Sequence, residues 1–215
     1  MVIEWLGHSC FKITLESGLK ILTDPYGPEV GYTAKDVEVD VVTVSHNHFD
    51  HNNLSHVKGN FTLVNTPGAH TFDGLVIEGL ETWHDHSQGA HRGKNIVFKY
   101  SADGIALCHM GDLGCIPDDA FFENLGSIDI LMIPVGGNYT IDAHEALAIC
   151  ERIGPNIIIP MHFKTPDSNL DIAPLHEFLE AVDREYDVSH HGKCYLNIDK
   201  ASLKKRTRVV VMEYL

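Results

Sequence analysis

The chain has 215 residues, which predicts one large or two small domains and excludes a large multidomain assembly. Hydrophobic residues make up 44% of it and charged residues 21%, which excludes a disordered, collagen-like or coiled-coil protein. With 16 basic and 30 acidic residues the formal net charge is −14, so the surface field disfavours nucleic acids and anionic membranes as partners.

The cysteines and the chain start bear on location. Five cysteines without any C-x-x-C pair predict neither a disulfide framework nor a cysteine-based zinc site. The first residues lack the apolar stretch of a signal peptide, and no run of 18 apolar residues predicts a membrane span. We therefore expect a cytoplasmic protein.

Short β-branched runs that end at Gly, Pro, Asn or Asp predict a series of strands. In chain order they cover residues 2–6, 10–15, 19–23, 40–45, 61–65, 75–82, 95–100, 105–109, 129–134, 156–160, 193–197 and 208–213.

Helices are predicted at three places in the second half of the chain. Asp142 and Glu145 form an Asp-headed capping box before an apolar run that stops at Gly154. A second helix is predicted after Pro174, where one apolar face at helical spacing consists of Leu175, Phe178, Leu179, Val182 and Tyr186. A third, weaker helix is predicted after Pro117.

The order of these elements predicts the architecture. Strands occupy both ends of the chain and helices lie between later strands, which favours an α+β fold with two mixed sheets flanked by helices. Because no repeat or linker interrupts the chain, we expect a single domain over residues 1–215. The basic cluster at Lys204, Lys205, Arg206 and Arg208 is typical of a solvated turn.

The chain contains 15 histidines, and their densest cluster follows an apolar strand. Residues 40–44 lead directly into the string SHNHFDH. Residues two apart in an extended chain point the same way about 6.6 Å apart, so His46 and His48 can converge on one ion. Asp50 and His51 then fall on the following turn and could serve a second ion. Chance produces an H-x-H-x-D-H string only about 0.006 times in a chain of this composition.

Three further strand exits carry residues that can bind metal. His84 follows the predicted strand 75–82, with His86 and His91 close behind it. Asp112 follows strand 105–109, and His162 follows strand 156–160. Function-bearing residues commonly lie on loops at strand ends, so these positions predict one shared site.

These motifs resemble the metallo-β-lactamase superfamily. The superfamily pattern is an early Asp after a strand, the H-x-H-x-D-H string, a later His, a Gly-Asp pair and a final His. This chain matches it in the same order with Asp24, then His46, His48, Asp50 and His51, then His84, Gly111-Asp112 and His162. The segments GHSCF at the start, VGG and PMHF resemble further the branch of small hydrolases that includes L-ascorbate-6-phosphate lactonase. The resemblance implies a four-layer αβ/βα sandwich.

The resemblance also implies roles for these residues. His46, His48 and His84 would hold a first ion, Asp50, His51 and His162 a second, and Asp112 would bridge them. Asp24 would orient a ligand histidine, and His8 and His109 are candidates for the wall of the site. Among His84, His86 and His91 we prefer His84 because it directly follows its strand.

Two divalent ions would lower the pKa of a shared water and stabilise a developing oxyanion, which predicts a hydrolase. Asp50 is the candidate catalytic residue, because it can take the proton of that water. Zn²⁺ is the default ion, although Mn, Fe and Ni suit the same donors.

We expect an ester-like bond, a lactone or phosphoester, in a small anionic metabolite. Arg92, Lys94 and Lys164 lie near the proposed ligands, and Lys164 ranks first for contacting the substrate because it lies two residues from His162. Three alternatives remain: an RNA phosphodiesterase on the same fold, a di-iron redox protein, and a metal-binding protein without catalysis. His48 disfavours the redox protein, because such relatives typically carry Glu there. A homo-oligomer is compatible with the sequence.

Overall fold

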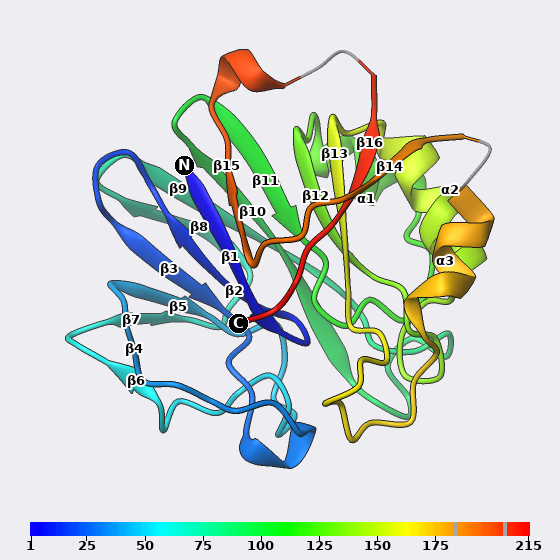
Figure 1. Ribbon diagram of the computed structural model, residues 1–215, viewed down its shortest axis with the longest axis horizontal. Coiled ribbons are helices and arrows are strands. Elements are labelled where there is room, and N and C mark those ends of the chain that lie inside the picture. The colour runs from blue at the N-terminus through cyan, green and yellow to red at the C-terminus, as the bar shows by residue number, and fades with distance from the viewer. Residues whose placement is uncertain (183–184, 204–205) are drawn as a thin grey trace.

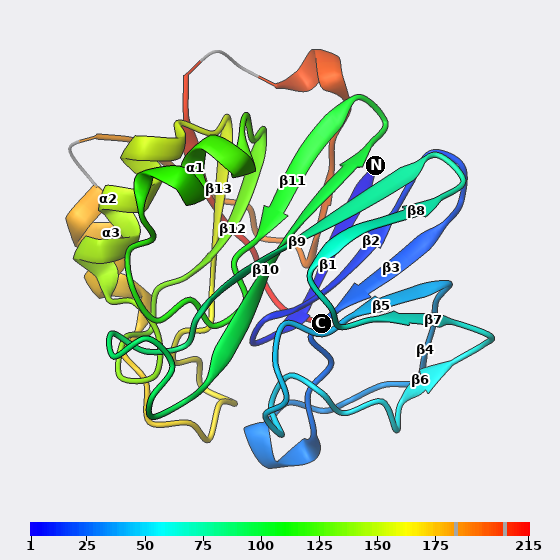
Figure 2. The same ribbon diagram turned by 180° about the vertical axis from the view of Figure 1, so that it is seen from behind.

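The computed structural model describes residues 1–182, 185–203 and 206–215. Two mixed β-sheets face each other and three α-helices lie along one side of the pair (Figure 1). The same arrangement is seen from behind in Figure 2. Both mixed sheets agree with the fold predicted from the sequence. No helix in these described ranges is long and apolar enough to cross a membrane.

The smaller of these two sheets has six strands in the order β15-β1-β2-β3-β5-β7. Strands β1, β2 and β3 form an antiparallel meander, whereas β3, β5 and β7 run parallel. The bounds are β1 Val2–Gly7, β2 Cys10–Thr14, β3 Lys20–Thr23, β5 Val41–Thr43, β7 Thr62–Val64 and β15 Tyr195–Asn197.

The larger sheet has eight strands in the order β14-β16-β13-β12-β11-β10-β9-β8. Strands β11, β12, β13 and β16 run parallel, and β9 points the same way because it is antiparallel to β10, which is antiparallel to β11. The bounds are β8 Gly68–Phe72, β9 Leu75–Trp83, β10 Lys94–Ala102, β11 Ile105–His109, β12 Ile130–Pro134, β13 Ile157–Met161, β14 Asp187–His190 and β16 Arg208–Val211. A separate pair, β4 Val37–Glu38 and β6 Val57–Lys58, lies outside both sheets.

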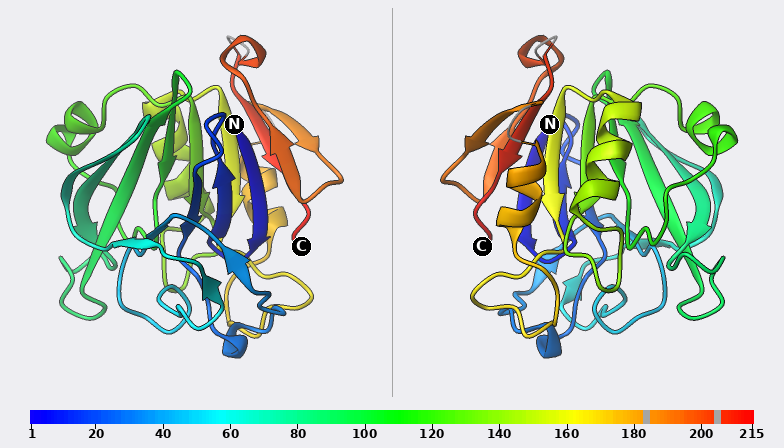
Figure 3. Two further views of the ribbon diagram at one scale, coloured as in Figure 1. Left: turned by 90° about the vertical axis from the view of Figure 1, so that its left-hand side faces the viewer. Right: turned by 90° about the vertical axis from the view of Figure 1, so that its right-hand side faces the viewer.

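The helices cover the outer face of the eight-stranded sheet (Figure 3). Helix α2 begins after the capping box predicted at Asp142 and Glu145, and ends at Gly154 in the left-handed conformation. The bounds are α1 Asp119–Leu125, α2 Ala143–Ile153 and α3 Leu175–Val182. All three predicted helices are therefore confirmed, while the predicted extension of α3 to Tyr186 crosses residues 183–184, which lie outside the described residues. Lys204 and Lys205 of the predicted basic turn also lie outside the described residues. A 3-10 helix is formed by Lys200–Ser202.

The main core fills the space between the sheets. Alternate residues of β2 divide between two cores, since Phe11 and Ile13 face the larger sheet while Cys10 faces outward. Strand β5 is buried on both faces, as its continuous apolar run predicts, with Val41 in the main core and Val42 in the outer one.

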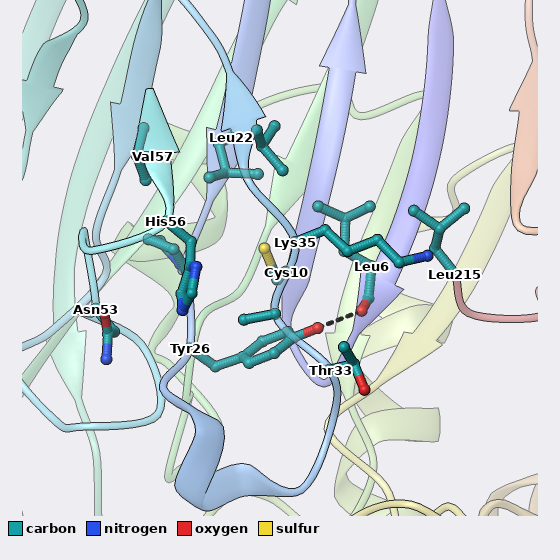
Figure 4. A pocket seen from close by; sticks show the side chains of 13 residues that line it. Leu6, Cys10, Leu22, Tyr26, Thr33, Lys35, Asn53, His56, Val57 and Leu215 are labelled. Atoms are coloured by element: carbon teal, nitrogen blue, oxygen red, sulfur yellow. Dashed lines mark hydrogen bonds between the residues drawn. The ribbon is translucent and has the colours of Figure 1, made fainter. Parts of the chain in front are cut away.

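The outer face of the six-stranded sheet is covered by irregular chain, and here the structure departs from the predicted helices on both sides. Residues 24–40 and 44–61 supply this cover, including the 3-10 helix Pro28–Val30. Prolines and glycines between β3 and β5 disfavour a longer helix. Figure 4 shows the small apolar pocket left there, of about 40 Å³, in which the Tyr26 hydroxyl donates to the Leu6 carbonyl at 2.6 Å.

The predicted strands are present within a few residues of their expected bounds. Strands β4, β6, β8 and β14 have no counterpart in the prediction. Strands β8 and β14 lie at the two edges of the larger sheet and are mostly exposed, so their sequences lack the apolar alternation on which the prediction depends.

Candidate metal centre

The predicted ligands lie at strand ends on one edge of the sandwich. His46 and His48 follow β5 in the six-stranded sheet, and His84, Asp112 and His162 follow β9, β11 and β13 in the larger one. These three strands run in the same direction, so their carboxyl ends share an edge. The Ile96 amide donates to the Ser45 carbonyl at 2.9 Å and ties the two sheets together beside the site.

A first group consists of His46, His48 and His84, whose ligand atoms all lie within 4.8 Å of one another. His46 and His84 are buried and His48 is half-buried. The structure thereby distinguishes the three histidines that follow β9: His84 points inward, whereas His86 is exposed, with Nε2 3.6 Å from the Glu145 carboxylate, and His91 is exposed.

A second group consists of His8, Asp50, His51 and His162, again with ligand atoms within 4.8 Å of one another. All four are buried, and Asp50 alone among them has measurable exposure, at 7%. Nε2 of His8 lies 3.3 Å from Oδ2 of Asp50. His8, expected at the wall of the site, therefore lies among the proposed ligands.

Asp112 lies between the two groups. Its Oδ1 is 3.2 Å from Nε2 of His51, and its Oδ2 is 3.3 Å from Nε2 of both His84 and His162. Nε2 of His46 is 3.8 Å from Oδ2. One carboxylate thus contacts members of both groups, which is the arrangement a bridging ligand requires.

Asp24 holds one histidine of each group. Its Oδ2 accepts from Nδ1 of His51 at 2.9 Å and from the Ser45 hydroxyl at 2.6 Å. Because the Ser45 hydrogen is donated to Asp24, the Ser45 oxygen accepts from Nδ1 of His46 at 2.9 Å. Both imidazoles consequently have Nδ1–H engaged on the side away from the site and direct Nε2 into it.

The backbone of Asp112 is held by Asn95 and, through the adjacent Gly111, by His109. The Asn95 side chain accepts from the Asp112 amide at 2.9 Å and donates to the Met110 carbonyl at 2.9 Å. Nδ1 of His109 accepts from the Gly111 amide at 3.1 Å, while its Nε2 donates to the Ser9 carbonyl. A Cβ at position 111 would lie 2.3 Å from Oδ1 of Asn95, so only glycine fits there.

Three of the site residues have strained backbones. His8, Asp24 and His162 adopt φ values of 52°, 40° and 53°, in the left-handed region that residues other than glycine rarely occupy. Such conformations persist where surrounding structure holds them, and they concentrate at functional sites.

The electrostatics of the site favour a bound cation. Burial alone would raise the pKa of Asp112, but the imidazoles of His162 and His51 lower it well below its usual range. Burial lowers the pKa of His46 well below its usual range and that of His8 to about 4, with neighbouring imidazoles adding to the effect. His46 and His8 are therefore neutral at neutral pH, the state in which imidazole binds metal ions.

Unpartnered atoms show that the residues fit a metal. Among the described residues, Nε2 of His46, Nε2 of His162 and Oδ1 of Asp112 are buried without a hydrogen-bond partner. Buried polar atoms are normally paired, and exceptions need an explanation. Each of these atoms can donate a lone pair, so one ion in each ligand group would account for Nε2 of His46 and Nε2 of His162, with Oδ1 of Asp112 between the two groups.

Ser45 and Asn95 are the site residues that sequence reasoning missed. They act through hydrogen bonds between elements distant in the chain, which no motif reports. Lys164, the residue expected to contact substrate, donates to the Ser168 and Leu170 carbonyls, both at 2.7 Å. Its ammonium group thus fastens its own loop, and its role toward substrate stays a prediction.

Comparisons with known proteins agree with this geometry. The family described as beta-lactamase superfamily domain matches residues 2–162. UPF0173 metal-dependent hydrolases from Thermococcus kodakarensis and Carboxydothermus hydrogenoformans are 30% and 31% identical, over 76% and 77% of this chain and 84% and 85% of theirs. A Thermotoga maritima structure of the metallo-beta-lactamase superfamily is 39% identical with a TM-score of 0.80, and the match covers 100% of this chain and 99% of that one.

The predicted superfamily and fold are thereby confirmed, while the finer resemblance to the lactonase branch stays a prediction. The chain belongs to the beta-lactamase superfamily and is a metal-dependent hydrolase.

Proposed function

We propose that this hydrolase holds two divalent ions and cleaves an ester-like bond, a lactone or phosphoester, in a small anionic metabolite. One observation carries the proposal: two separate groups of potential ligands share the single carboxylate of Asp112. The groups together contain too many donors for one tetrahedral ion.

Two such ions, when bound, activate water as a nucleophile at neutral pH and stabilise the charge that develops on the scissile group. Zn²⁺ is the default ion, although imidazole and carboxylate ligands also suit Mn, Fe and Ni. Asp50 is the residue proposed to take the proton of the attacking water. Its carboxylate is the most exposed member of its group, and the imidazoles around it outweigh burial and lower its pKa below the usual range, so it is ionised.

A cavity of about 230 Å³ next to the first group supports an anionic substrate. His84, Arg92 and Tyr139 line it. The Arg92 guanidinium stacks on the Tyr139 ring, 4.3 Å from its centroid, and among the described residues it has no carboxylate partner. Arg92 is therefore the better candidate than Lys164 for contact with a carboxylate or phosphate of the substrate.

The acidic residues around this cavity are already engaged. The Asp85 carboxylate accepts four backbone N–H groups at 2.7 to 3.0 Å, including that of Arg92. These bonds outweigh desolvation and lower the pKa of Asp85 to about 2. Asp142 and Glu145 are occupied by the capping box of α2. Asp85 thus holds the backbone of the loop that carries Arg92, and we propose that the Arg92 guanidinium contacts the ligand.

The experiment combines metal analysis of the purified protein with a panel of neutral esters, anionic lactones, phosphomonoesters and RNA. Two ions per chain and turnover of a small anionic ester or lactone would support the proposal. Turnover of RNA alone would favour the phosphodiesterase, a redox-active di-iron centre without hydrolysis would favour the redox protein, and bound metal without any turnover would favour a metal-binding role.

A further inference from the structure

His8 belongs to a different part of the chain from the H-x-H-x-D-H string. It lies in the turn between β1 and β2 and is fully buried. Its carbonyl accepts from the Trp5 indole at 3.0 Å and from the His162 amide at 3.3 Å. These two bonds hold the strained backbone of His8 and aim its imidazole at the second group.

The spacing of its donor atom is informative. Nε2 of His8 lies 3.3 Å from Oδ2 of Asp50 and 3.3 Å from Nε2 of His51, and the latter two atoms lie 3.5 Å apart. Ligand atoms placed tetrahedrally about 2.1 Å from one ion lie about 3.4 Å from each other. The three distances therefore match the edges of one coordination tetrahedron. The two N···O distances, 3.3 and 3.5 Å, are also longer than the usual 2.7 to 3.2 Å of N–H···O hydrogen bonds.

We propose that His8 is a metal ligand, and that it joins Asp50, His51 and His162 so that, together with the shared Asp112, protein side chains occupy every position on that ion. This rests on the proposed two-ion function. Closed sites with four protein ligands are typical of tightly held ions, whereas a site of three ligands keeps a position open for water or substrate.

The two ion sites are consequently unequal. The His8 group is entirely buried, whereas the first group contains the half-buried His48, and its His84 lines the cavity that contains Arg92. The substrate therefore approaches the first group. The ion of the His8 group would lie deeper in the protein and share the Asp112 carboxylate with the ion of the first group.

The first test uses the wild-type protein loaded with Co²⁺. NMR of the exchangeable imidazole protons, with 15N-labelled histidine, counts the histidines bound to the paramagnetic ions. We expect six, namely His8, His46, His48, His51, His84 and His162. A His8 imidazole that shows only the smaller through-space shift of a neighbouring group, without the large contact shift of a coordinated nitrogen, would overturn the proposal. This result does not depend on turnover. A wild-type protein that binds a single ion would refute the two-ion function, whereas the His8 signal would still show whether His8 binds that ion.

The second test measures the zinc affinity of His8→Gln, with His86→Gln as the control. His86 lines the cavity beside His84, but it is exposed and belongs to neither ligand group. We expect His8→Gln to keep one ion and to bind the second at least tenfold more weakly, while His86→Gln keeps both. In His8→Ala, added imidazole should restore the second ion. Unchanged affinity for both ions in His8→Gln, or equal losses in the two Gln variants, would contradict the proposal.

Discussion

Oδ2 of Asp24 lies 2.9 Å from Nδ1 of His51, and this contact fixes the proton of that imidazole on the side away from the proposed ions. The same oxygen reaches His46 through the Ser45 hydroxyl. One buried carboxylate therefore orients a histidine in each of the two ligand groups.

Asp24→Asn should weaken the binding of both ions, because Asp24 orients a histidine in each ligand group. The new amide can donate to Nδ1 of His51 and move the imidazole proton onto Nε2. We expect the metal affinity to fall about 10-fold to 100-fold, with activity partly restored by excess metal. Ser45→Ala is the comparison, since it breaks only the link to His46 and should weaken one ion. Titration with a chromophoric chelator measures both; equal effects of the two substitutions would contradict this account.

Metal content also separates the histidines that follow β9. His84→Ala should lose metal because His84 is buried in the first group, whereas His86→Ala and His91→Ala should keep it because both side chains are exposed. Elemental analysis of the purified variants checks this. Loss of metal from His86→Ala with retention in His84→Ala would show that the loop is oriented differently in solution.

The sequence could predict that these proposed ligands lie together, because they follow strands in a compact, recognisable spacing. The H-x-H-x-D-H string and the strand exits before His84 and His162 are local features, and the structure brings them together. His8 was assigned to the wall because a lone histidine in a hairpin turn carries no such local signal. Its place depends on how the turn between β1 and β2 folds back over β13, which is a tertiary contact.

The fold shows the same division between local and long-range information. Strands with apolar runs, such as β5 and β12, were predicted, whereas the exposed edge strand β8 was not. The predicted sandwich has helices outside both sheets, and the structure has its three α-helices outside the eight-stranded sheet. The cover over the other sheet depends on packing of a proline-rich and glycine-rich segment, which hydrophobic periodicity does not describe.

Asp50→Asn tests the proposed proton acceptor. The substitution preserves shape and removes the carboxylate charge, so kcat should fall about 10²-fold to 10⁴-fold while at least one ion stays bound. Steady-state kinetics in metal-replete buffer, together with metal analysis of the same sample, provide the measurement. Near wild-type turnover would leave Asp50 as a ligand only.

Arg92→Ala tests recognition of the anionic substrate. Loss of one charge-assisted hydrogen bond should raise KM for an anionic substrate about 10-fold to 100-fold and leave a neutral ester nearly unaffected. Lys94→Ala is the control, because Lys94 is exposed and already pairs with Glu81 at 2.9 Å. A similar increase in KM for both substrates, or for both variants, would argue against a specific anion contact.

The number of ions per chain distinguishes a dinuclear site from a mononuclear one. Wild-type protein, saturated with Zn²⁺ and freed of excess metal, should contain close to two ions per chain by elemental analysis, and His46→Ala should contain at least one ion fewer. A fully active wild-type protein with a single ion per chain would contradict the dinuclear site.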